Sequence, residues 1–284
     1  MPPWSSLLVE AVAFGFFGTM VWQAWKAGPA KLTKLTTLLV AAAFGFAIEL
    51  FFVTVYAGYS YGHFLVAFPV GGSLVPLWVA AGWGTIIYVS MEATERMGLT
   101  WYAAPPLSGL LALSLDVALD PIAVALDWWT WSRPSQFFDI PYDNFIGWVL
   151  IVTSYALGVR GGLELFKRHG IWKDIVVPIA SLLLAVGAVA GSQLLLEKVF
   201  YPWLGEPHTF ALLVIVLGLY LAPFMWKTKP TGTLPWFVWV VPGSYHLMFL
   251  VLLFTTGISS TTPELVMFLL VAPVASLFLF THPR

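Results

Sequence analysis

The sequence Leu-Leu-Ala-Leu-Ser-Leu-Asp-Val-Ala-Leu-Asp-Pro, residues 110–121, is an apolar run that contains two aspartates. Asp116 and Asp120 are four residues apart, so in a helix their side chains project from the same face. A charged carboxylate inside a bilayer costs roughly 2.5–3.5 kcal/mol on insertion scales, and intramembrane acids usually mark a functional site. A structural pair, hydrogen-bonded to neighbouring helices, is the alternative interpretation. The stretch therefore predicts an apolar helix that carries a candidate acid site.

The composition of the whole chain is that of an integral membrane protein. Of its 284 residues 60% are hydrophobic and 10% are charged, against about 25% charged in soluble domains. The chain has no cysteine, which excludes disulfides, thiolate catalysis and thiolate metal sites. The formal net charge of −1 gives no indication of nucleic-acid binding. We therefore expect an all-α, polytopic helical bundle, with residues 1–284 as a single membrane domain.

Apolar runs of about 20 residues, the length that crosses a bilayer, occur nine times in the chain. The third run is rich in Gly and Trp, and Pro273 interrupts the ninth. Seven or eight helices with a re-entrant segment is therefore the alternative to nine. The nine predicted transmembrane helices are residues 5–25, 35–56, 74–93, 104–126, 144–164, 174–196, 208–226, 235–256 and 263–281.

Basic residues are distributed unevenly over the connections between these runs. Eleven of the thirteen lie on one side of a nine-helix arrangement, and only Arg133 and Lys198 lie on the other. Because cytoplasmic loops carry the excess of Lys and Arg, we expect a plasma-membrane protein with its N-terminus outside and its C-terminus in the cytoplasm. The eleven residues are Lys26, Lys31, Lys34, Arg96, Arg160, Lys167, Arg168, Lys173, Lys227, Lys229 and Arg284.

Two neighbouring carboxyl groups in an apolar site are suited to acid catalysis. Burial favours the neutral form of a carboxylic acid, and a second acid nearby favours keeping one proton on the pair. Such an acid could protonate an alkene to a tertiary carbocation, which nearby aromatic faces would stabilise. A carboxylate or a tyrosine could then direct water onto the cation or remove a proton from it.

Other functions fit parts of the same pattern. Intramembrane acids also serve proton or cation transport, and the chain could instead be a lipid-binding protein. Asp-x-x-x-Asp motifs bind magnesium diphosphate in membrane prenyltransferases, but diphosphate needs several basic residues, and Arg133 is alone in the loop beside the acids. His63 and His246 are too far apart in sequence to predict a metal site. No lysine lies inside a predicted helix, which argues against a retinal protein.

Two segments carry a more specific pattern. The first holds Glu49, then Tyr59-Ser-Tyr61-Gly62, Val75-Pro-Leu-Trp78 and Tyr88. The second holds Asp116-x-x-x-Asp120-Pro121, then Trp129-Thr-Trp131 and Ile140-Pro-x-x-Asn144-Phe-x-Gly147-Trp148. Over about residues 45–150 the chain resembles the carotenoid-biosynthesis membrane protein family, which includes the bacterioruberin-pathway and γ-carotene hydratases. The C-terminal half matches that family in hydropathy only.

The resemblance implies a cofactor-independent lyase that adds water across the terminal C=C of an acyclic carotenoid or isoprenoid ψ-end. Its partners would be the apolar substrate, water and membrane lipid. A membrane terpene or carotenoid cyclase and an isomerase stay open, because they begin with the same protonation. The implied catalytic acids are Asp116, Asp120 and Glu49. The candidate substrate-binding residues are Tyr59, Tyr61, Trp78, Tyr88, Asp127, Trp129, Trp131, Asn144, Trp148 and His246.

Small residues mark a possible route for such a substrate. Residues 41–43 with Gly45, and residues 80–82 with Gly84, are small in two consecutive predicted helices. Small residues let helices pack closely, or part to leave a lateral slot toward lipid. The sequence alone leaves both interpretations open.

The orientation can be tested by cysteine labelling. The charge distribution places the connection between residues 126 and 144 on the non-cytoplasmic side. A Ser135→Cys variant should therefore react with an impermeant thiol reagent in intact cells, without interference from any native cysteine. Labelling only after lysis would invert the predicted topology.

Overall fold

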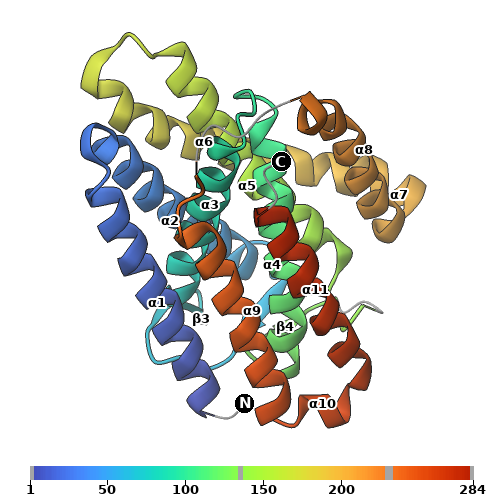
Figure 1. The fold of residues 1–284 in the computed structure, drawn as a ribbon. Helices are drawn as coiled ribbons and strands as arrows, with labels where there is room; N and C mark the ends of the chain where they lie inside the picture. The colour runs from blue at the N-terminus through green and yellow to red at the C-terminus, as the bar shows by residue number, and fades with distance from the viewer. Residues whose placement is uncertain (1–2, 134–136, 228–232, 282–284) are drawn as a thin grey trace.

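A computed structural model of the chain describes residues 3–133, 137–227 and 233–281, with side chains as far as residue 274. In this part of the chain, nine helices of 19 or more residues form a bundle (Figure 1). Each coincides, to within four residues at either end, with one of the nine predicted runs. The all-α polytopic bundle is therefore confirmed. The nine helices are α1 (Pro3–Trp25), α2 (Lys31–Thr54), α3 (Leu77–Arg96), α4 (Ala104–Ala125), α5 (Tyr142–Leu165), α6 (Lys173–Leu195), α8 (Glu206–Lys227), α9 (Phe237–Thr255) and α11 (Pro263–Thr281).

The described helices differ in how well they suit a bilayer. Seven are long and apolar enough to cross one, namely α1, α2, α4, α5, α6, α8 and α9. Helix α3 instead buries Thr85, Ser90, Glu92 and Thr94 and contacts α1, α2, α4 and α9. Protein rather than lipid therefore surrounds most of α3, which explains how a helix this polar can lie in the bundle. The number of membrane crossings, nine in the sequence analysis, stays a prediction.

The connections alternate between the two ends of the bundle. Those that follow α1, α3 and α5 lie at the upper end in Figure 1, whereas β4 (Trp129–Trp131) and α10 (Ile258–Thr261) lie at the lower end. The upper connections are the ones that carry most of the basic residues. Lys229, Arg284 and the labelling position Ser135 lie outside the described residues. Two exposed positions that the structure describes can serve in the same labelling experiment: Thr130 in β4 and Ile171 between α5 and α6. We expect a cysteine at position 130 to react in intact cells and a cysteine at position 171 to react only after lysis.

Two short strand pairs form at the lower end, in the connections between the long helices. Residues 74–76, predicted to begin the third helix, belong instead to a strand. β1 (Tyr59–Tyr61) pairs antiparallel with β4, so that Tyr59 is opposite Trp131 and Tyr61 is opposite Trp129. β2 (Ala67–Val70) and β3 (Ser73–Pro76) form a hairpin. Gly71 and Gly72 of its turn have φ of 56° and 83°, a conformation that two-residue hairpin turns require and that glycine adopts without strain. The β1–β4 pair joins residues that are 68 to 72 positions apart in sequence.

Glu10 of α1 fixes the loop before β2. Its side chain is buried, and its two carboxylate oxygens accept the backbone N–H groups of Leu65 at 3.2 Å and Val66 at 2.9 Å. Further along the lower end, the indole N–H of Trp128 donates to the Ser5 hydroxyl at 3.4 Å. Helix α1 therefore holds both connections that cover this end of the bundle.

The small residues of α2 and α3 mainly serve close packing. A Cβ on Gly45 would overlap the Trp83 side chain, and one on Gly84 would lie 2.8 Å from Ala42 and 2.9 Å from Phe17. A lateral slot at these two glycines is therefore closed by packed side chains. Gly82 is different, because an added Cβ there meets no atom within 4 Å.

The Glu10 contact generates a prediction about local stability. In Glu10→Ala, the amides of Leu65 and Val66 lose their acceptors, at a cost of roughly 1–3 kcal/mol of local stability. Hydrogen exchange of these two amides should accelerate accordingly. Thr19→Ala, at an exposed position of the same helix, should leave their exchange unchanged. Equal protection in the unaltered protein and in Glu10→Ala would remove this anchoring role.

Candidate active site

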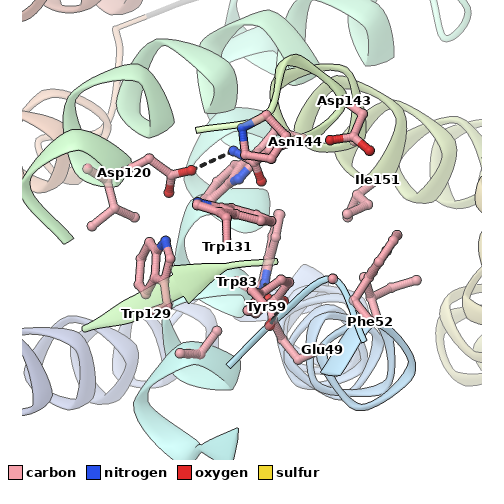
Figure 2. Close-up of a pocket in the computed structure, with 18 of the residues that line it drawn as sticks. Glu49, Phe52, Tyr59, Trp83, Asp120, Trp129, Trp131, Asp143, Asn144 and Ile151 are labelled. Atoms are coloured by element: carbon pink, nitrogen blue, oxygen red, sulfur yellow. Dashed lines mark hydrogen bonds between the residues drawn. The ribbon is translucent and has the colours of Figure 1, made fainter. Parts of the chain in front are cut away.

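The described residues enclose a large pocket bordered by α2, α3, α4, α5 and the β1–β4 pair (Figure 2). It holds about 1340 Å³ of empty space, counting the part that is open to the exterior. Small-molecule sites are usually mostly apolar with a few placed polar groups. The lining here is largely aromatic and aliphatic. The pocket is therefore suited to an apolar ligand.

An acid pair on α4 forms one wall of this pocket. Asp120 lines the pocket, whereas Asp116 is fully buried behind it. The side-chain amide of Asn144, in the first turn of α5, donates to Asp120 Oδ2 at 2.6 Å and to Asp116 Oδ2 at 3.1 Å. The shared amide holds the two carboxyl groups side by side. Two carboxyl groups so close together in a buried site favour keeping one proton on the pair.

Local sequence explains why α4 and α5 meet here. At Gly109 of α4, an added Cβ would lie 2.8 Å from the carbonyl oxygen of Val149 on α5, so only glycine allows this approach. Pro141 precedes α5 in an extended conformation and fixes where the helix starts. Asn144 of α5 then falls opposite Asp116 and Asp120, which lie two to three turns beyond Gly109 on α4.

Glu49 of α2 forms a second polar centre in the pocket. Its Oε1 accepts the indole N–H of Trp83 at 2.7 Å, and its Oε2 accepts the Tyr61 hydroxyl at 2.6 Å and the Tyr59 hydroxyl. Burial, followed by the nearby Glu49 charge, raises the pKa of both tyrosines of β1 well above the usual value. Both therefore stay protonated donors. Glu49 also acts electrostatically on Asp116 and Asp120.

Aromatic rings line the space around these acids. Trp83 and Trp148 lie with ring centroids 4.1 Å apart, Tyr59 and Trp131 4.7 Å apart, and Trp78 and Trp129 are stacked at 6.4 Å. In Figure 2, Trp131 lies in view between Asp120 and Glu49. The indole N–H groups of Trp78, Trp129 and Trp131 are buried without a partner among the described residues. The walls thus offer π-faces for a cation and N–H donors for an oxygen atom.

The structure brings most of the predicted site residues together. The ones that line the pocket are Glu49, Tyr59, Tyr61, Trp78, Asp120, Trp129, Trp131, Asn144 and Trp148, with Asp116 directly behind.

Three predicted residues are not part of the pocket lining. Tyr88 lies further along α3 and stacks on Phe237 at 6.2 Å. Asp127 is exposed just after α4, in the left-handed region at φ 55°. His246 is buried on α9, and its neighbour Tyr245 lines the pocket instead, because adjacent residues on a helix point in different directions. The geometry gives these three no contact with a ligand there.

Other lining residues did not stand out in the sequence. Trp83 is one of several tryptophans in its region of the sequence, so nothing local distinguishes it. Its hydrogen bond to Glu49 joins two different helices. Tyr245 and Phe249 are four residues apart on α9, which could have indicated a shared face. Arg133 was noted for its charge, and it lines the pocket as well. Among the residues described, no group of three His, Asp or Glu side chains could hold a metal ion.

Comparison with known families agrees with this site. The family model described as "carotenoid biosynthesis protein" matches residues 10–204, from Glu10 on α1 to the end of α7 (Tyr201–Leu204). The chain belongs to the carotenoid biosynthesis protein family. The match confirms the resemblance over residues 45–150 and extends it in both directions. Curated proteins and solved structures give no match.

Two glycines of α3 in this carotenoid biosynthesis protein can distinguish an effect on ligand binding from an effect on helix packing. Gly82 lines the pocket with open space at its Cβ position, whereas Gly84 is packed against Ala42 and Phe17. Gly82→Leu should fold normally and raise the KM for a long polyene far more than for a short isoprenoid alkene. Gly84→Leu should lower the Tm, because overpacking costs about 1–3 kcal/mol.

Gly187→Leu is the matched control. Gly187 also has open space at its Cβ position, but it lies on the exposed face of α6 and does not line the pocket. It should change neither KM nor Tm. An equal rise in KM for long and short substrates in Gly82→Leu would contradict the role of Gly82 in accommodating a long chain.

Proposed function

We propose that this multi-pass membrane protein is a carotenoid hydratase, a cofactor-independent lyase of the hydro-lyase type. It would add water to the terminal C=C of an acyclic carotenoid or isoprenoid ψ-end. The observation that carries the proposal is the buried acid pair Asp116 and Asp120, bridged by the Asn144 amide at the wall of an aromatic pocket. Membership of the carotenoid biosynthesis family supports the substrate class.

The acid pair divides the work of protonation. Asp120 lines the pocket and would deliver its proton to the inner carbon of the terminal C=C, leaving a tertiary carbocation at the dimethyl-substituted carbon. Asp116 is buried behind Asp120 and does not line the pocket, so it would share its proton with Asp120 rather than touch the substrate. Asn144 donates to both carboxyl groups and keeps them in contact through the reaction.

The cation would be stabilised by the surrounding groups. Trp131 and Trp129 present π-faces, and Glu49 supplies negative charge while its three donors hold it in place. Water then attacks the cationic carbon, and the acid pair takes the released proton. The alkene has gained one water molecule as a tertiary alcohol, and the pair has returned to its starting state.

A pigment assay separates hydration from the alternatives. In a bacterium that makes lycopene, production of this protein should yield a carotenoid heavier by one water mass. A new product of unchanged mass would support a cyclase or isomerase, which share the protonation step. Absence of any new product from lycopene and from shorter acyclic isoprenoids would favour transport or lipid binding.

We also propose that the protein lies in the plasma membrane with its N-terminus outside, because the basic residues are concentrated in the connections at one end of the bundle.

The acid pair generates a mutational prediction. Asp116→Asn and Asp120→Asn keep the side-chain shape but remove the shared proton, so each should lower turnover by about 10²–10⁴-fold, the usual contribution of general acid–base catalysis. Asp139→Asn is the control, because Asp139 is exposed, lies outside the pocket lining and has a left-handed φ of 61° that asparagine also tolerates. Membrane insertion should be equal in all three. Near-normal turnover in both α4 variants would rule out the pair as the proton source.

A further inference from the structure

A second cavity, which we call the polar vestibule, adjoins the acid pocket. It is bordered by residues 56–58, by Arg133, and by the segment that joins η3 (Leu196–Phe200) to α7. It opens to the exterior with about 920 Å³ of empty space. Its lining is mainly polar, in contrast to that of the acid pocket. Tyr56, Gly58, Arg133 and Glu206 line both cavities. The vestibule and the pocket therefore meet at these four residues.

A hydrogen-bonded cluster marks this meeting point. The Tyr56 hydroxyl accepts a hydrogen bond from Arg133 Nη2 at 2.5 Å and donates to Glu197 Oε1 at 2.7 Å. The segment is held in place by Ser132, whose backbone N–H donates to the Gly58 carbonyl at 2.9 Å and whose hydroxyl donates to the Ala57 carbonyl at 2.6 Å. The neck between the two cavities is thus formed by polar side chains on a fixed backbone.

The start of α5 continues this polar lining toward the acids. Asp143 lines the pocket and interacts electrostatically with Tyr56, Arg133 and Glu206. The next residue, Asn144, donates to Asp120 at 2.6 Å. Figure 2 shows Asp143, Asn144 and Asp120 in succession along one side of the pocket. A polar edge therefore runs from the neck to the acid pair, while most of the remaining lining is apolar.

A hydratase needs a polar path for water, because water is scarce in an apolar pocket. If no water reaches the carbocation, the carbocation loses a proton instead. We propose that the polar vestibule is the site from which water enters, and that Tyr56, Arg133 and Asp143 guide it to the cation beside Asp120. These residues then determine whether the cation ends as an alcohol or as an alkene. This route rests on the proposed hydratase function and adds the source of its second substrate.

The chemistry distinguishes the two outcomes in heavy water. Addition of a deuteron to the inner carbon of the terminal C=C gives the tertiary cation. Attack by D₂O on the cationic carbon and loss of one deuteron to the acid pair then give the alcohol. Without water at the cation, loss of a proton from carbon restores an alkene that retains deuterium. Deuterium in the recovered carotenoid therefore reports protonation, and alcohol reports water delivery.

The experiment compares both readouts for lycopene incubated with the full-length protein in D₂O. Tyr56→Phe removes the hydroxyl at the neck, and Arg133→Met removes the group that donates to it. Gly58→Leu adds bulk at the neck, because an added Cβ there would lie 3.1 Å from the Tyr56 ring. Each should lower the ratio of alcohol to incorporated deuterium about tenfold, the effect of losing one hydrogen-bond partner of a bound water. Deuterium incorporation itself should persist, which shows that the variants are folded and acid-competent.

Tyr220→Phe is the matched control, because Tyr220 is exposed on α8 and bonds the Tyr102 carbonyl away from both cavities. It should leave the ratio unchanged. An unaltered ratio in all three neck variants, or an equal loss of alcohol and deuterium, would overturn the water route while the hydratase proposal stands. If the unaltered protein forms neither alcohol nor deuterated carotenoid, the hydratase proposal fails, and the route fails with it.

Discussion

The need to give every buried carboxyl group a partner organises this bundle. Glu10 holds two backbone N–H groups of a loop, and Glu49 holds donors from β1 and α3. Glu92 of α3 pairs with Lys34 of α2, and the α4 acids share Asn144 of α5. An unpaired buried polar group costs about 1–3 kcal/mol, and an unpaired charge costs more. Each acid therefore links its own helix to an element distant in sequence.

The partners also give the acids different chemical properties. Glu49 receives three hydrogen bonds from groups that keep their protons, so it is held as an acceptor. Asp116 and Asp120 instead lie side by side and share the Asn144 amide, an arrangement that favours keeping one proton on the pair. The two acid sites of one pocket therefore differ through their neighbours alone: donors surround one, and the other is paired with a second acid.

Aromatic side chains surround both acid sites. The register of β1 and β4 sets Tyr59 against Trp131 and Tyr61 against Trp129. These pocket-lining rings therefore belong to the same pair of strands that supplies two of the three donors to Glu49. A substitution in this small sheet would change the pocket wall and the hydrogen bonds of Glu49 together. The pocket is thus apolar enough for a polyene and still holds its acids in a defined arrangement.

The sequence by itself determined the helices and the acids, because these depend on local properties. Runs of about 20 apolar residues gave the positions of all nine long helices, and the spacing of Asp116 and Asp120 placed both on one face of α4. The segments Tyr59-Ser-Tyr61 and Trp129-Thr-Trp131 pointed to the family. Only the tertiary structure decided which of these residues meet. Strand pairing in the connections, the closeness of α4 and α5 at Gly109, and the bond from Trp83 to Glu49 join distant parts of the chain. The directions of Tyr88 and His246, outside the pocket lining, were likewise set by how α3 and α9 pack. Hydropathy shows that a helix is buried in lipid or protein, but the rotation of each helix about its axis depends on neighbours that no local pattern specifies.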